Sequence, residues 1–417
     1  MKRLLWRIKK DKMGKHILVV SIHYYPESFR ITNLCEKWVK RGYKVTVVTG
    51  IPNYPEGNFY KGYGWFKKRK EIINGVNVRR LKIFPRKTGK IRLALNYFSF
   101  LFRGFFFAKF NRIKADYVFT FGISPLIQAK ISNWYKKNKK VKRIIYVQDL
   151  WPENLVAVGI NNKSLYNYVD KMMRKIYKKT DLVLTTSNSF IESVANMGVK
   201  RENIKFWPQY CEEFYKPVDG TIRTNEIPND GTANFIFTGN IGVAQGLGVL
   251  VEVAAKLKEK DVKVRFNIVG DGREKENLIS SVVDKDVKEY FNFLGRKNAS
   301  DIPGYLSICD AALLTFNESP IFERTIPAKF QSYIACGMPI IGCANGEIAK
   351  IIVDNNLGLC SSVGDVDGLL DDILKFIEMT KEEKKAISKT ALDYSKNHFD
   401  ETKLLDKFDE IIKELGE

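Results

Sequence analysis

Apolar and polar positions in the first half of the chain predict an alternation of buried strands and amphipathic helices. Residues 17–22 form a continuous apolar run, residues 31–41 have helical periodicity, and residues 44–49 form a second apolar run. Further strands are predicted over residues 117–120, 143–147 and 182–185. Continuous apolar runs are typical of strands that are covered on both faces. This rhythm therefore predicts a parallel sheet with crossover helices.

The second half repeats the pattern after a segment rich in Pro, Gly, Asp and Asn, residues 217–234. Strands are predicted over residues 235–238, 265–269, 291–294 and 311–315, and helices over 247–260 and 402–415. A chain of 417 residues exceeds the usual size of one core. We therefore expect an α/β protein with two Rossmann-like domains, residues 1–213 and 214–395, that face a cleft. Residues 396–417 should form a helix that crosses back to the first domain.

The composition, with 45 % hydrophobic residues, is typical of a soluble globular protein. No apolar run reaches the ~18–20 residues of a membrane-spanning helix, and the N-terminus lacks the apolar core of a secretion signal. The six cysteines are scattered, which predicts reduced thiols in the cytosol. Because His16, His23 and His398 lie far apart in the sequence, we expect no bound metal.

The net charge of +22 predicts an anionic partner. The basic residues gather in the first half, around residues 67–70, 79–80, 86–92, 136–143 and 171–179. Among them lies an aromatic-rich stretch, residues 93–114, which could be a helix in the interface of an anionic membrane or a core helix of the first domain. We find no recognisable nucleic-acid reader and expect no nucleic-acid partner.

The segment over residues 318–341 carries the strongest chemical signal. A polar loop with Pro320 and Pro327 leads into a short helix that ends at Gly337, and an apolar strand follows. Lys329 lies in the first turn of that helix, and Arg324 lies just upstream. A helix N-terminus offers free N–H donors and partial positive charge, so with two cations it predicts a diphosphate site. The alternative is an ordinary helix, turn and buried strand.

This segment resembles the signature of retaining family-4 glycosyltransferases, enzymes of the GT-B fold. The matching residues are Pro327-Ala328-Lys329 and Tyr333-Ile334-Ala335-Cys336-Gly337-Met338-Pro339. The family usually carries two glutamates with seven residues between them. Ser332 stands at the second of these positions and Arg324 at the first, with Glu323 next to it. The resemblance implies that Lys329, Arg324 and Glu323 act in catalysis and that Lys329 and Ser332 also contact the donor.

Three further loops of the second half extend the resemblance on the donor side. The sequence GNIGVAQG, residues 239–246, is similar to a subgroup that includes N-acetylfucosamine transferases of bacterial O-antigen and capsule assembly, and it implies donor contacts from Gly242 and Gln245. Arg296 lies where the family's nucleobase loop lies, and Glu347 could bind the donor sugar. The alternatives are a plain glycine-rich turn for GNIGVAQG and a carboxylate that stabilises a helix dipole for Glu347.

Two motifs of the first half resemble the acceptor side of the same subgroup. The sequence DLWPE, residues 149–153, places Asp149 at a strand end as a catalytic residue, with Glu153 as a second carboxylate. The sequence HYYPE, residues 23–27, implies that His23 and Glu27 line the acceptor side. Asp149 and Glu153 could instead be helix caps, because Pro152 suits a first helical turn.

Together, the motifs imply a metal-independent, retaining transfer of a sugar from a UDP-sugar to a polyprenyl-diphosphate-linked saccharide. The first domain would bind the acceptor and the second the nucleotide sugar, with no cofactor besides the donor substrate. We expect an N-acetylated hexosamine or deoxyhexosamine as the sugar, and a peripheral position at the inner face of the cytoplasmic membrane. The alternatives are a UDP-sugar 2-epimerase and a non-catalytic, membrane-associated scaffold that binds nucleotide sugars.

Overall fold

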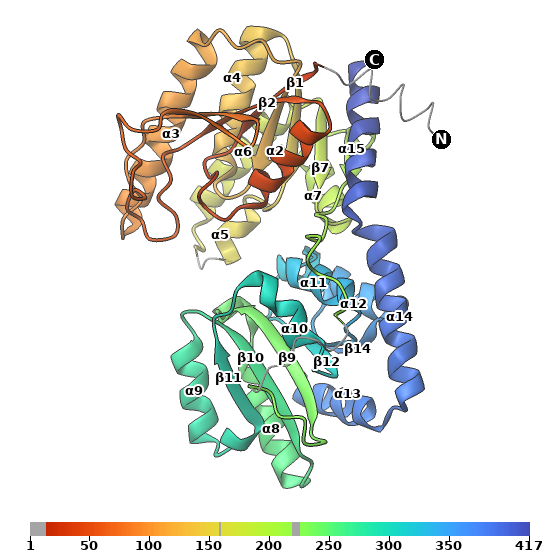
Figure 1. Ribbon diagram of the computed structural model, residues 1–417. Coiled ribbons are helices and arrows are strands. Elements are labelled where there is room, and N and C mark those ends of the chain that lie inside the picture. The colour runs from red at the N-terminus through yellow and green to blue at the C-terminus, as the bar shows by residue number, and fades with distance from the viewer. Residues whose placement is uncertain (1–13, 158–159, 219–225) are drawn as a thin grey trace. The chain divides into compact units, whose positions relative to one another are not determined.

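A computed structural model describes residues 14–157, 160–218 and 226–417. The chain divides into two compact units (Figure 1). Unit 1 comprises Met1–Thr186, Phe190–Phe206 and Lys413–Glu417, and unit 2 comprises Ser187–Ser189 and Trp207–Ile412. The last five residues of the chain therefore belong to unit 1, although the helix that contains most of them belongs mainly to unit 2.

Unit 1 contains an eight-stranded sheet in the order β3-β4-β2-β1-β5-β6-β7-β8. All neighbouring strands are parallel except β3 and β4. The strands are β1 (His16–Val20), β2 (Lys44–Thr49), β3 (Lys70–Ile73), β4 (Val76–Arg80), β5 (Tyr117–Gly122), β6 (Lys142–Val147), β7 (Leu182–Thr185) and β8 (Ile204–Phe206). The helices are α2 (Arg30–Lys40), α3 (Lys90–Phe110), α4 (Ala129–Lys139), α5 (Glu153–Ala157), α6 (Lys163–Tyr177) and α7 (Ser189–Asn196).

Unit 2 contains a six-stranded parallel sheet in the order β11-β10-β9-β12-β13-β14. The strands are β9 (Ala233–Asn240), β10 (Val264–Asp271), β11 (Phe291–Gly295), β12 (Ala311–Thr315), β13 (Ile340–Cys343) and β14 (Gly358–Ser361). The helices are α8 (Gly248–Glu259), α9 (Lys275–Asp284), α10 (Ile302–Leu306), α11 (Ala328–Ala335), α12 (Gly346–Asp354), α13 (Val366–Glu378), α14 (Lys381–His398) and α15 (Glu401–Gly416). Short 3₁₀ turns include η3 (Val243–Gln245) and η6 (Phe322–Arg324).

The cores of both units follow from the apolar runs in the sequence. In unit 2, Phe235, Phe266, Leu313 and Ile341 come from four neighbouring strands and are fully or almost fully buried in one cluster. In unit 1, α2 buries one face of its surface, with Trp38 completely covered. Strands covered on both faces need apolar residues at successive positions, as these strands have.

The predicted fold class is confirmed: the protein is α/β with two mainly parallel sheets, the arrangement of the GT-B fold. The predicted strands are all present, and the structure adds β3, β4, β8 and β14, which the sequence patterns did not predict. Among the described residues, no helix is both long and apolar enough to cross a bilayer. All six cysteines are free thiols.

Candidate functional site

The start of α11 positions Lys329. Pro327 precedes the helix with extended backbone angles, φ −75° and ψ 143°, and no side chain caps the helix N-terminus. Proline has no N–H of its own, and its fixed φ suits the entry to a helix. The first backbone donors of α11 are therefore left without a side-chain acceptor, which favours an anion at this helix end.

The ammonium group of Lys329 is buried against β9. Its Nζ lies 3.7 Å from the centroid of the Phe237 ring. A Cβ placed on Gly239 would lie 3.6 Å from the same nitrogen, so the lysine tip lies directly beside the glycine backbone. Nζ has almost no accessible surface and no hydrogen-bond partner in the part of the chain that the structure describes, although the residue as a whole is half-buried.

Burial of this nitrogen lowers the pKa of Lys329 to about 7. A buried ammonium without an anion is unfavourable, because it has lost water and gained no opposite charge. The cation–π contact with Phe237 offsets part of this cost. An incoming diphosphate would supply the missing anion, so the arrangement is suited to bind one.

The loop after β9 is closed by its own side chains. The N–H of Gly242 donates to Oε1 of Gln245 over 3.2 Å, and the Gln245 carbonyl accepts from Thr315 Oγ1 over 2.6 Å. Gly246 has a φ of 57°, and a Cβ there would lie 2.7 Å from the Phe316 backbone. Gly242 and Gln245, predicted as donor contacts, thus hold the turn against the end of β12. Whether they also contact a donor stays a prediction.

Glu323 and Arg324 form η6, which packs on the start of α12. A Cβ on Gly346 would lie 2.0 Å from the Glu323 carbonyl oxygen, so only glycine permits this approach. Glu323 lines a small pocket whose other lining residues are Phe316, Asn317, Ser319, Phe322, Asn345 and Val363. The Arg324 carbonyl accepts from Ser187 Oγ over 2.6 Å.

The other donor-side predictions have separate places in the structure. Ser332 is buried in α11, donates to the Ala328 carbonyl over 3.2 Å and lies within hydrogen-bond reach of Tyr215. Glu347 lies in the first turn of α12 and accepts from the Asn188 and Ser189 N–H groups over 2.8 and 2.6 Å, within unit 2. Arg296 is exposed just beyond β11, two places along the sheet from β9. Contact of Arg296 with the donor substrate stays a prediction.

In unit 1, Asp149 follows β6 and fastens the loop after β5. Its Oδ2 accepts from both the N–H and the Oγ of Ser124, each over 2.7 Å. Burial raises the pKa of Asp149, although hydrogen bonds from Ser124 and Asn154 oppose the rise. Asp149 is therefore a half-buried carboxyl group at the carboxyl end of a parallel strand, where ligands of such sheets bind.

His23 and Glu27 form a buried pair. His23 Nδ1 lies 2.8 Å from Glu27 Oε2, and the His23 ring stacks on Phe29 with centroids 4.7 Å apart. Glu27 Oε1 accepts from the N–H groups of Asn53 and Tyr54, both over 2.7 Å. The glutamate is fully engaged and braces two loops, so of the two His23 is the better candidate for contact with an acceptor.

Glu153 is the first residue of α5, and its Oε2 is buried with no hydrogen-bond partner among the described residues. Its negative charge adds to the effect of burial in raising the pKa of Tyr177. Unit 1 thus contains the four side chains predicted on the acceptor side: His23, Glu27, Asp149 and Glu153.

Two family models match successive parts of the chain. Residues 29–209 match Glycosyltransferase Family 4, and residues 219–393 match Glycosyl transferases group 1. The chain is a glycosyltransferase. Over 339 residues this glycosyltransferase is 26 % identical to WcaI of Escherichia coli (strain K12), named as a colanic acid biosynthesis glycosyl transferase, covering 77 % of this chain and 81 % of that protein.

Solved structures share the fold of this glycosyltransferase. Sucrose-phosphate synthase from Thermosynechococcus elongatus aligns with a TM-score of 0.76 at 14 % identity and covers 96 % of this chain and 99 % of that one. Alr3699/HepE of Anabaena in complex with UDP-glucose aligns with a TM-score of 0.69 at 14 % identity and covers the same shares. At these identities the likeness shows the GT-B fold alone.

The sequence patterns did not identify Phe237 or Ser124 as residues of the predicted site of this glycosyltransferase, nor Gly239 as a neighbour of Lys329. Phe237 and Gly239 form the surface under Lys329, and Ser124 holds Asp149. Gly239 and Ser124 each follow an apolar run at the carboxyl edge of a parallel sheet, and that position could have drawn attention to them. No group of three or more His, Cys, Asp or Glu residues that could hold a metal occurs in the described ranges.

Proposed function

We propose that this glycosyltransferase moves a sugar, with retention at the anomeric carbon, from a UDP-sugar to a polyprenyl-diphosphate-linked saccharide in surface polysaccharide synthesis. The observation that carries the proposal is the buried, unpartnered ammonium of Lys329 at the uncapped start of α11. The proposed donor sugar is an N-acetylated hexosamine or deoxyhexosamine. The UDP-glucose complex of HepE supports a nucleotide sugar as donor, and the likeness to WcaI supports a polysaccharide product.

The leaving diphosphate gains negative charge as the glycosidic bond breaks. Lys329 and the free N–H groups of α11 would stabilise this charge, and they need little reorganisation because packing already fixes them. Arg324 would add a second cation from η6. These groups would supply the positive charge that a metal ion supplies in other transferases. Gly242, Gln245, Arg296, Ser332 and Glu347 would complete the donor site, and Glu323 would contact the sugar.

Retention would follow if the acceptor hydroxyl attacks on the face that the diphosphate leaves. A diphosphate oxygen would then accept the hydroxyl proton, so no separate base would be required. Asp149 would orient the acceptor hydroxyl, because its carboxyl group is held at a strand end by Ser124. His23, Glu27 and Glu153 would shape the acceptor side around it. The acceptor's lipid would hold the enzyme at the inner face of the cytoplasmic membrane.

The test is incubation with radiolabelled UDP-sugars and a polyprenyl-diphosphate-linked saccharide. Label on the lipid product, with the anomeric configuration of the donor, supports the proposal. A free isomer of the donor would instead indicate a 2-epimerase. Binding of the nucleotide sugar with neither product would indicate a non-catalytic scaffold.

A further inference from the structure

Helix α3 buries one face, which combines small and polar residues with one fully covered phenylalanine. Its buried residues are Asn96, Ser99, Phe100, Gly104 and Ala108. A Cβ on Gly104 would lie 2.2 Å from Ile131 Cδ1, so α3 presses closely against α4, and the two helices lie side by side (Figure 1). This close contact fixes which face of α3 is turned inward.

The opposite face of α3 is aromatic and exposed. We define the aromatic ridge as the residues Phe98, Phe102, Phe105, Phe106 and Phe110. Phe98 and Phe110, near the two ends, are 64 % and 66 % exposed, and the other three range from 38 % to 49 %. Successive rings at a spacing of four residues touch, with centroids 6.2, 5.1 and 6.2 Å apart. One-sided exposure of five phenylalanines on one helix marks an interaction surface.

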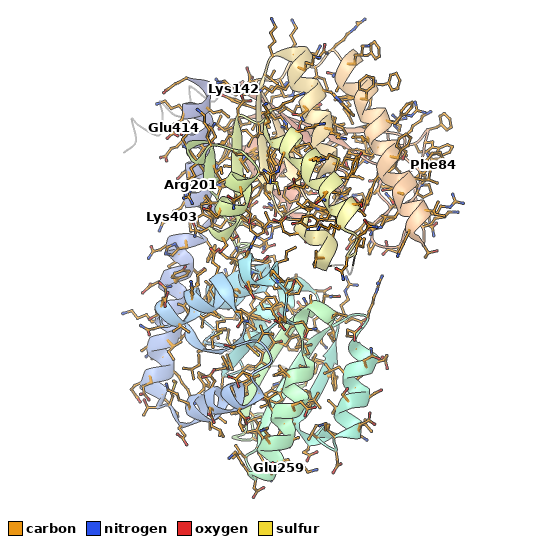
Figure 2. All side chains as sticks on the ribbon, turned by 180° about the vertical axis from the view of Figure 1, so that it is seen from behind. Phe84, Lys142, Arg201, Glu259, Lys403 and Glu414 are labelled. Carbon is orange, nitrogen blue, oxygen red and sulfur yellow. The ribbon has the colours of Figure 1, made fainter. Side chains whose placement is uncertain are left out.

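The ridge continues past the helix. The N–H of Phe84 donates to Ser99 Oγ of α3 over 3.0 Å, and its carbonyl accepts from Asn96 Nδ2 of α3 over 2.6 Å. Phe84 is itself 43 % exposed. Its ring lies edge-on to Trp65, with centroids 5.8 Å apart. Figure 2 shows Phe84 at the rim of unit 1 beside α3, where side chains of the helix project outward.

The charge around the ridge identifies its partner. Residues 72–115 contain eleven lysines and arginines and no aspartate or glutamate. Arg103, Lys109 and Arg112 are exposed, and none of them forms an ion pair among the described residues. A second copy of the chain would bring like charges together, which is unfavourable. Exposed rings flanked by unpaired cations fit the headgroup region of an anionic bilayer.

We propose that the aromatic ridge of α3 docks on an anionic lipid bilayer, with its rings among the headgroups and the flanking cations on the phosphates. The inference deepens the proposed function. It rests on that function only for the reason why the protein would dock, which is to bring unit 1 to a lipid-linked acceptor. The docking is peripheral, because none of the described helices can span a bilayer.

The test is sedimentation of the full chain with vesicles of phosphatidylglycerol and phosphatidylcholine, compared with pure phosphatidylcholine. We expect binding to the anionic vesicles that 0.5 M salt reduces but does not abolish. The variant Phe98→Ser/Phe102→Ser/Phe106→Ser should lose the salt-resistant part and bind about tenfold or more weakly. Because these rings are exposed, circular dichroism should show an unchanged fold. Arg103→Gln/Lys109→Gln should weaken the salt-sensitive part instead.

Tyr168→Ser is the matched control, since Tyr168 is 64 % exposed on α6 of the same unit, and it should bind vesicles normally. Wild-type protein that fails to sediment with anionic vesicles, or a triple variant that binds like wild type, would overturn the inference. Ridge-dependent dimerisation in analytical ultracentrifugation without vesicle binding would also overturn it. UDP binding, and transfer of the sugar to a short-chain, water-soluble acceptor, are measured in parallel. A wild-type protein that shows neither would refute the proposed function and leave the docking result intact.

Discussion

The ammonium nitrogen of Lys329 lies 3.7 Å from the centre of the Phe237 ring and has no hydrogen-bond partner among the described residues. The aromatic face partly compensates for lost water, but it does not replace an anion. The unliganded protein therefore keeps a cation in an unfavourable place that an anionic ligand would make favourable. Removal of the charge on Lys329 should therefore weaken the binding of an anionic ligand and increase the stability of the free protein.

Replacing Lys329 with methionine should weaken UDP binding and stabilise the free protein. Loss of one charge-assisted contact costs roughly 1.5–3 kcal/mol, or about 10- to 150-fold in Kd. Removal of a buried, unpaired charge should raise the free energy of unfolding by about 1–4 kcal/mol. Calorimetric titration with UDP and urea unfolding measure the two effects.

The control for this variant is Lys350→Met, because Lys350 is exposed on the neighbouring helix α12. It should change neither quantity by more than about 0.5 kcal/mol. A Lys329→Met protein that binds UDP like wild type would show that Lys329 is not a diphosphate ligand.

UDP binding should take up a proton near pH 8. In the free protein burial lowers the pKa of Lys329 to about 7, so at pH 8 most molecules carry a neutral amine. A diphosphate beside Nζ favours the ammonium form, and the complex gains up to one proton. Calorimetry in HEPES and in Tris, which differ in ionisation enthalpy, measures this uptake. It should disappear in Lys329→Met, and an uptake that persists there would assign the proton to another group.

The same lysine should make the stability of the free protein depend on pH. The ordinary pKa of lysine is 10.5, and that of folded Lys329 is about 7. Between these values the unfolded chain binds more protons, so the free energy of unfolding should rise with pH across this window. The destabilisation is fully present below pH 7 and is relieved towards pH 10.5. Urea unfolding at several pH values should show this rise in wild type and a smaller one in Lys329→Met.

Local sequence patterns predicted the strands and the helix that carries Lys329. Apolar runs of four to six residues located the strands, and Pro327 and Gly337 marked the ends of α11. The contact between Lys329 and Phe237 joins residues about ninety positions apart, and it depends on how α11 packs on β9. No periodicity contains that information. The short strands β3, β4 and β8 were missed because charged residues interrupt their apolar pattern, and β14 was missed because only two of its four residues are apolar.

The orientation of α3 also could not be predicted from the sequence. Aromatic residues occupy almost every turn of this helix, so its pattern left both a core helix and an interfacial helix open. The structure shows that Phe100 is 1 % exposed while Phe98 is 64 % exposed. Gly104 was the available signal, because a glycine inside a helix often marks a close approach of a neighbour.

Asp149→Asn should reduce turnover and leave UDP affinity nearly unchanged. The substitution keeps the size of the side chain, and its amide oxygen can still accept from the Ser124 N–H group. It removes the negative charge that would orient an acceptor hydroxyl, so we expect a loss of about 10²-fold in kcat. Single-turnover assays and UDP titration separate the two quantities. A variant with normal turnover at saturating substrate would remove Asp149 from the catalytic residues.

Arg143 provides a prediction about stability that does not depend on function. Its guanidinium is completely buried and donates to Ser132 Oγ, Thr180 Oγ1 and the carbonyls of Ala129 and Ile176, over 2.6–3.0 Å. Burial lowers its pKa to about 9. Arg143→Met would remove these four hydrogen bonds from the interior of unit 1 and should lower the free energy of unfolding by about 3–5 kcal/mol. Lys142→Met, at the exposed neighbouring position labelled in Figure 2, should change it by less than about 0.5 kcal/mol. Urea unfolding followed by tryptophan fluorescence measures both variants, and equal stabilities would show that this network contributes nothing to the fold of unit 1.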